Sequence, residues 1–75
     1  MIKINKIITG DRTLTITGKL VNTNYWKNRL EKVIKGIINE TDYIISDTEL
    51  SRKINEQTKE NTDEEIDFIV QVNKP

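Results

Sequence analysis

Residues 12–21 read Arg-Thr-Leu-Thr-Ile-Thr-Gly-Lys-Leu-Val, and apolar and polar side chains alternate along them. In an extended chain, Leu14, Ile16 and Leu20 point to one side, whereas Lys19 and the threonines point to the other. This period of two residues predicts a β-strand that buries one face and leaves the other in water.

The segment before this strand carries a second apolar row and predicts the first arm of a β-hairpin. The two rows share one face of the hairpin only if the loop between the arms has an odd length. We therefore expect a three-residue loop, Gly10 to Arg12. The resulting pairs are Ile8 with Leu14 and Ile2 with Leu20.

Residues 25–40 predict the main helix, because large apolar side chains recur there at helical spacing. The apolar face consists of Trp26, Leu30, Val33, Ile34, Ile37 and Ile38. Residues 22–24, Asn-Thr-Asn, supply candidate N-caps. Trp26 is the largest of these side chains, so we expect it to contribute most to the core and Trp26→Ala to cost about 3–5 kcal/mol.

Two further strands are predicted in the second half of the chain. Residues 43–46, Tyr-Ile-Ile-Ser, form a short apolar run, and residues 66–72 alternate between the two faces of a strand. Residues 61–63, Asn-Thr-Asp, predict a turn before the last strand.

Two interpretations remain open for residues 47–58. Ser46, followed three residues later by Glu49, resembles a capping box and favours a helix. In an extended conformation, Leu50 and Ile54 would instead share one strand face and form a second hairpin with the last strand. The Glu, Gln and Lys content supports the helix, which we adopt.

The fold class that follows is α+β, with residues 1–75 forming a single small domain in the order β-β-α-β-(α)-β. A mostly antiparallel sheet carries the main amphipathic helix on one face. The expected core consists of Ile4, Ile8, Leu14, Ile16, Leu20, Trp26, Leu30, Val33, Ile34, Ile37, Phe68 and Val70.

Catalytic chemistry is poorly supported by the residue types present. The chain has no Cys and no His, which excludes disulfides, thiolate nucleophiles and the commonest transition-metal ligands. The carboxylates of residues 63–67 match no calcium-loop spacing, and Gly10 and Gly18 lie too far apart for a phosphate loop. We expect no enzyme activity, no metal and no cofactor.

The composition also suggests where the protein acts. No signal segment opens the chain and no apolar run approaches the about 20 residues of a membrane span, so we expect a cytoplasmic protein without a membrane partner. Thirteen isoleucines and no alanine are typical of an AT-rich bacterial or phage genome, and the cytoplasm would then be that of the bacterium or the phage host.

Charge is sorted along the chain. Residues 1–35 carry eight basic and two acidic residues, a net charge of +6, and residues 36–75 carry four basic and ten acidic residues, a net charge of −6. The basic half predicts a candidate nucleic-acid surface on the outer face of the main helix. Its residues are Asn28, Arg29, Lys32 and Lys35.

The acidic half predicts a candidate protein interface instead. The acidic residues are Glu56, Glu60, Asp63, Glu64, Glu65 and Asp67. Apolar residues on the outer row of the sheet would add a patch, and these are Ile7, Val21 and Ile69.

From these surfaces we expect a non-enzymatic protein-interaction module that binds a larger protein partner. A phage or mobile-element accessory protein that inhibits a host protein fits the size and composition. The alternative is a small nucleic-acid-binding regulator that uses the basic half. Free strand edges also leave room for a homo-oligomer.

Overall fold

The computed structural model describes residues 2–60 and 65–74. Its elements are β1 (Ile2–Thr9), β2 (Thr13–Val21), α1 (Trp26–Asn39), α2 (Asp47–Gln57), β3 (Thr58–Glu60) and β4 (Glu65–Asn73). The strands form one sheet in the order β1-β2-β4-β3, in which all neighbours are antiparallel. The α+β class is confirmed.

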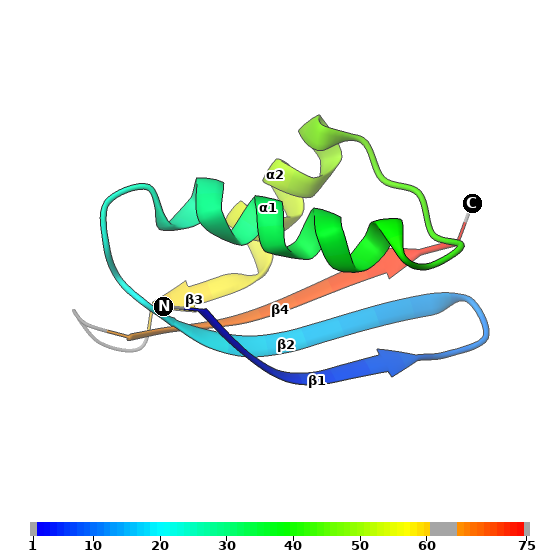
Figure 1. Ribbon diagram of the computed structural model, residues 1–75, viewed down its shortest axis with the longest axis horizontal. Coiled ribbons are helices and arrows are strands. Elements are labelled where there is room, and N and C mark those ends of the chain that lie inside the picture. Colours follow the sequence, from blue (N-terminus) through cyan, green and yellow to red (C-terminus); the bar gives the residue numbers. More distant parts are fainter. Residues whose placement is uncertain (1, 61–64, 75) are drawn as a thin grey trace.

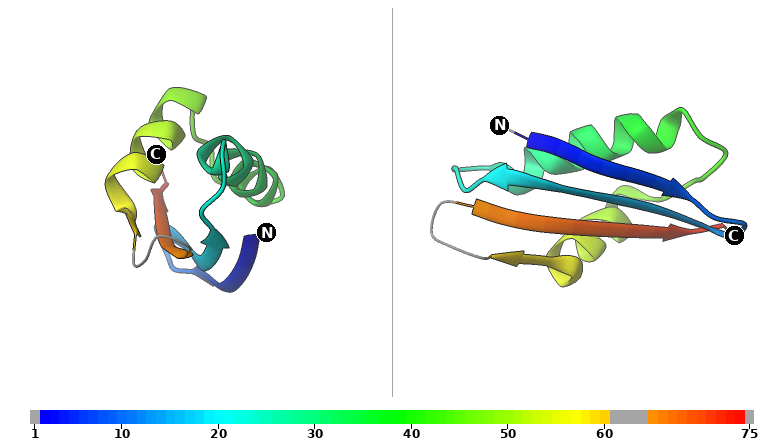
Figure 2. Two further views of the ribbon diagram at one scale, coloured as in Figure 1. Left: turned by 90° about the vertical axis from the view of Figure 1, so that its left-hand side faces the viewer. Right: turned by 90° about the horizontal axis from the view of Figure 1, so that it is seen from below.

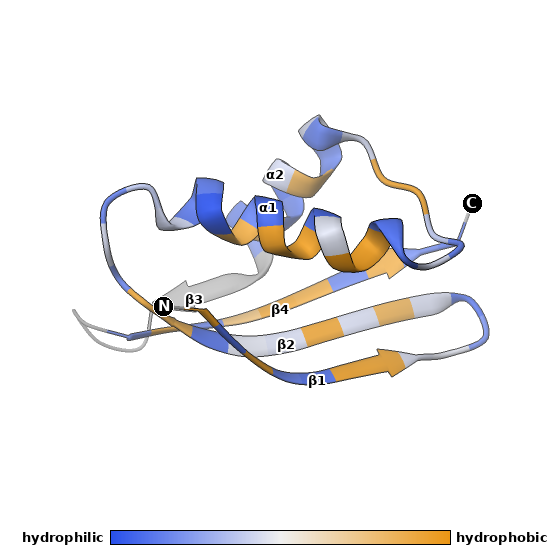
Figure 3. Ribbon diagram, viewed as in Figure 1, coloured by the Kyte–Doolittle hydropathy of each residue, from blue (hydrophilic) through white to orange (hydrophobic). Residues whose placement is uncertain are grey.

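Both helices lie on the same face of the sheet (Figure 1). Viewed from below, the sheet stands in front and α1 and α2 lie behind it, so no helix of the described residues covers the opposite face (Figure 2). Apolar residues of α1 gather on the flank turned toward the strands (Figure 3). The core between the layers is made of Leu14, Ile16, Leu20, Leu30, Ile34, Ile38, Tyr43, Ile45, Leu50, Ile54, Ile66, Phe68, Val70 and Val72.

The predicted three-residue loop is wrong, because Gly10 pairs with Thr13 across a two-residue turn. The predicted register therefore holds only at the end of the hairpin far from this turn. Ile2 faces Leu20 as expected, but a bulge at Asn5 shifts the pairing by one residue, so Ile8 faces Thr15 and not Leu14. Ile8 therefore lies on the uncovered face and is 53 % exposed, outside the core. A bulge reverses the side on which every later residue of the strand points.

Gly18 explains where the bulge forms. It lies opposite Ile4 in β1 and opposite Phe68 in β4. A β-carbon added there would lie against the carbonyl oxygen of Lys3 and 2.6 Å from Cζ of Phe68. The missing side chain thus allows β1 and the Phe68 ring to approach the β2 backbone closely, as glycine in a strand often does.

The start of α1 differs from the expectation. The N-cap is Tyr25, which has a left-handed backbone conformation (φ 66°) and makes no capping side-chain hydrogen bond, so residues 22–24 are not caps. Trp26, Val33 and Ile37 are only partly buried. They lie on one flank of the helix, which the sheet covers only in part. Phe68 and not Trp26 is therefore the largest fully buried side chain.

The strand predicted at residues 43–46 is wrong. This segment is an irregular connection, and the fourth strand of the sheet is β3. Tyr43 and Ile45 are nonetheless buried and belong to the core cluster. The Tyr43 hydroxyl donates to the carbonyl oxygen of Gly10 at 3.4 Å, which ties this connection to the hairpin loop.

Helix α2 is confirmed, and the alternative second hairpin through Leu50 and Ile54 is wrong. The Ser46 hydroxyl accepts a hydrogen bond from the backbone N–H of Glu49 at 3.2 Å, as a capping residue does. The turn predicted at residues 61–63 lies outside the described residues. Among the described residues, no helix is long and apolar enough to cross a membrane.

Candidate interaction surfaces

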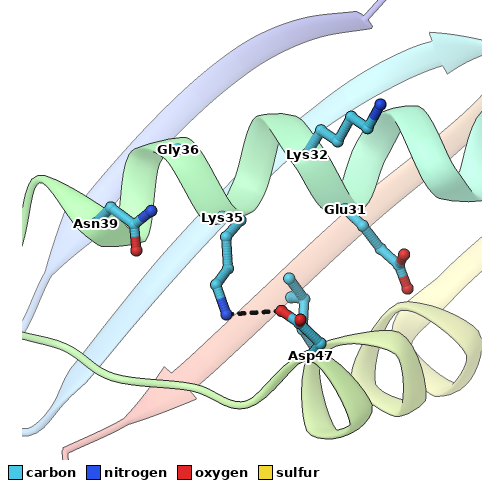
Figure 4. Close-up of a pocket in the computed structure, with 7 residues that line it drawn as sticks. Glu31, Lys32, Lys35, Gly36, Asn39 and Asp47 are labelled. Atoms are coloured by element: carbon cyan, nitrogen blue, oxygen red, sulfur yellow. Dashed lines mark hydrogen bonds and ion pairs between the residues drawn. The ribbon is translucent and has the colours of Figure 1, made fainter.

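One of the residues predicted as a basic surface on α1 makes contacts within the protein. The Nζ of Lys35 donates to the carbonyl oxygen of Ile45 at 2.9 Å and to Oδ1 of Asp47 at 2.8 Å. Lys35 therefore points toward the start of α2, and it holds the connection between the helices (Figure 4). Two of the three N–H donors of Lys35 are therefore engaged within the protein.

The other three members of that set are exposed. Arg29 and Lys32 are three residues apart and therefore neighbours on the outer side of α1. Arg29 also lines a groove beside β1, and Lys32 lines the groove between the helices. Asn28 is exposed as well. The role of these residues as a nucleic-acid surface stays a prediction.

The groove between the helices has a volume of about 410 Å³ and is open to solvent. It is lined by Glu31, Lys32, Lys35, Gly36, Asn39, Asp47 and Leu50. Cations and carboxylates alternate around it, and Lys35 already pairs with Asp47. In the part of the chain that the structure describes, no three Asp or Glu side chains come together in a metal-ligating group.

The acidic residues of the predicted protein interface that the structure describes belong to α2, β3 and β4, and Glu65 lines a shallow groove together with Lys3 and Lys19. Glu56 is exposed on α2, Glu65 is exposed at the start of β4, and Asp67 is partly buried in β4. Glu60 belongs to β3, and Asp63 and Glu64 lie outside the described residues. Their role as a protein interface stays a prediction.

The uncovered face of the sheet carries polar residues with isolated apolar ones. The threonines of β2 and Lys19 lie on it, as predicted. Val21 (45 % exposed) and Ile69 (53 %) are exposed. Ile69 lies opposite Thr17, which is four residues before Val21 on β2. Ile69 and Val21 are therefore about 13 Å apart along the strands. They do not form one patch.

The predicted third member of that patch lies elsewhere. The bulge places Ile7 opposite the buried Ile16, and so on the face that the helices cover. Ile7 is still 50 % exposed, because β1 is the edge strand. The sequence signal for this bulge was Lys6, which interrupts the apolar row of the first arm. The shift in pairing places Lys6 on the polar face, opposite Thr17.

An apolar groove, which sequence reasoning missed, runs between α1 and the sheet near β1. Its volume is about 310 Å³, and it is lined by Ile2, Leu20, Val21, Thr23, Trp26, Arg29 and Val33. The partly buried Trp26 and Ile2 form its two sides. We call this groove the α1–β1 groove. It arises because the partly covered flank of α1 faces the edge strand.

The outer edge of β1 is free of strand partners within the described residues. The N–H of Gly10 donates to the carbonyl oxygen of Thr13 at 2.8 Å, which makes this a hydrogen-bonded pair. Hydrogen-bonded and non-hydrogen-bonded pairs alternate along an antiparallel ladder. The backbone N–H and C=O groups of Ile8 therefore point toward β2, whereas those of Ile7 and Thr9 point away from β2. Donors and acceptors therefore line the edge next to exposed isoleucines.

Compared with known proteins, the chain matches no family model, no curated protein and no solved structure at a significant level. Functional inference consequently rests on the surfaces described above.

Proposed function

We propose that the protein is a small protein-binding module, which acts by docking onto a larger protein and modulating it. The observation that carries this proposal is the exposure of large apolar side chains along the sheet. These are Ile7, Ile8, Val21 and Ile69, each about half exposed. Exposed apolar side chains next to a free strand edge favour contact with another protein.

The composition supports an accessory protein of a phage or mobile element, with inhibition of a host protein as its mode of action. Such a protein needs surface and not catalytic chemistry. The absence of Cys and His from the sequence agrees with that role.

Affinity capture from the source cell, after nuclease treatment, tests the proposal. We expect a protein that is retained by the wild type and by Gly36→Ala, whose position contacts no neighbouring side chain, and that is lost with Ile69→Glu or Ile7→Pro. Retention that is the same for all four proteins, or no retention by the wild type, would contradict it.

A second candidate is a nucleic-acid-binding regulator that uses the basic half of the chain, in which the uncovered face of the sheet adds cations to those of α1. Lys3 lies opposite Lys19, and Lys6 lies opposite Thr17 in the threonine row. Titration of random duplex and single-stranded DNA at increasing salt tests it. A steep loss of affinity with salt supports this candidate, and no retention at low salt removes it.

A further inference from the structure

We infer that the edge of β1 and the α1–β1 groove together form one docking site, which takes an extended, acidic and apolar segment of the partner as a fifth strand. This inference rests on the proposed function and specifies the surface and the chemistry of the partner. Strand addition of this kind combines backbone hydrogen bonds with alternate side chains that enter pockets.

The backbone of β1 supplies the first part of the site. The N–H and C=O groups of Ile7 and Thr9 point away from β2, and β1 is an end strand of the sheet. The opposite edge, β3, has only three residues, whereas β1 has eight. Because each added residue pair extends the ladder, the longer edge favours addition of a strand.

The α1–β1 groove supplies the second part. A strand added beside β1 would direct alternate side chains to the helix-covered side of the sheet. There they would meet Ile2 at the sheet and Trp26 and Val33 on α1, which line the groove. Apolar residues at every second position of the segment would therefore cover surface that is now partly exposed.

Charge selects the partner. β1 carries Lys3 and Lys6 and no acidic residue, and Arg29 lines the groove beside it. Acidic residues at the alternate positions of the segment would lie on the uncovered face, next to the two lysines. A second copy fits less well, because two β1 strands side by side would bring four lysines together without a carboxylate between them.

Synthetic peptides test the site without the natural partner. The probe has about ten residues, with glutamate alternating with valine. One control replaces glutamate with lysine, and another groups the same residues in two blocks. We expect the alternating acidic peptide to bind the wild type and Gly36→Ala. Each control peptide should bind at least about tenfold more weakly than the acidic peptide.

Variants and hydrogen exchange locate the bound peptide. Ile7→Pro removes an outward N–H at an edge position that tolerates proline, so we expect it to lose peptide binding while the folded spectrum is kept. Ile7→Thr keeps that N–H, so its affinity for the peptide should fall only a few-fold. In the wild type, the amides of Ile7 and Thr9 should become protected from exchange when the peptide binds.

Three results would overturn the inference. The first is that the acidic peptide does not bind at millimolar concentration. The second is that folded Ile7→Pro binds the peptide as well as the wild type does. The third is a concentration-dependent dimer that Ile7→Pro abolishes, because a second copy of the chain would then occupy the site. If captured protein is lost with Ile69→Glu but kept by Ile7→Pro, the proposed function stands and only this site fails.

Discussion

Two glycines show how differently the same residue type acts in this fold. Gly18 lies buried between the backbone of β1 and the ring of Phe68, so there is no space for a side chain. Gly36 lies on the exposed side of α1, and an added β-carbon there would contact nothing within 4 Å. One position needs glycine for its small size, and the other only loses helix propensity by having it.

We expect opposite effects from alanine at these two positions. Gly18→Ala should lower the free energy of unfolding by about 2–3 kcal/mol, because the new methyl group overlaps fixed backbone and the Phe68 ring. Gly36→Ala should raise it by about 0.5–1 kcal/mol. Urea unfolding measures both, and equal effects would contradict the close approach at Gly18.

The largest side chains should also rank by burial and not by size. Phe68→Ala should cost about 3–5 kcal/mol, since its ring is fully buried. Trp26→Ala should cost less, about 2 kcal/mol, because Trp26 is partly buried at the wall of a groove. Thermal and urea unfolding provide the comparison, and a larger loss for Trp26 would place it back at the centre of the core.

At the scale of elements, the connection between α1 and α2 depends on polar contacts more than on regular structure. The hydroxyl of Ser46 caps α2, and Lys35 reaches from α1 to the carbonyl oxygen of Ile45. The buried Tyr43 and Ile45 keep this irregular segment against the core. Its backbone groups therefore find partners without a strand.

Loss of the cap should weaken α2. We expect Ser46→Ala to lower the free energy of unfolding by about 1 kcal/mol, because the N–H of Glu49 loses its acceptor. Ser46→Asp restores an acceptor and should recover most of the loss. Urea unfolding of the three proteins checks this, and no difference between alanine and aspartate would contradict the capping role.

Lys35 should matter more than its neighbour Lys32. We expect Lys35→Met to cost about 1 kcal/mol, mainly through the hydrogen bond to Ile45. The ion pair with Asp47 adds little, because the Asp47 side chain is 91 % exposed. Lys32→Met, on the same exposed helix, should change stability by about 0.5 kcal/mol or less. Equal losses, measured by urea unfolding, would remove the structural role of Lys35.

At the scale of the whole molecule, the two halves of the chain depend on each other. The central pair of the sheet joins β2 from the first half to β4 from the second. Leu14, Ile16 and Leu20 are covered by residues from both halves. The basic half, with β1, β2 and α1, and the acidic half, with α2, β3 and β4, nevertheless occupy different sides of the fold (Figure 2).

We expect residues 1–40 alone not to fold. They retain the hairpin and α1 but lose β4 and α2, which bury one side of β2 and of α1. The fragment should show no cooperative thermal transition by circular dichroism, and its amide resonances should be poorly dispersed. A cooperative transition in the isolated fragment would show that the first half is a folding unit of its own.

Elements with strong periodicity could be predicted from local sequence alone. The alternation of β2 and β4, the apolar face of α1 and the Ser46 cap of α2 are local patterns, in which neighbouring residues are enough to define the structure. The α+β class follows from these elements and their order. For the site, the sequence identified exposed isoleucines and lysines but assigned Ile7 to the wrong face.

Tertiary structure alone decided the remaining features. The bulge at Asn5 follows from the close approach at Gly18, and the short pairing of β3 with β4 defines the far edge of the sheet. Trp26 lines a groove because α2 covers the other flank of α1. Each of these depends on residues far apart in the chain that compete for the same space, and local periodicity carries no information on that competition.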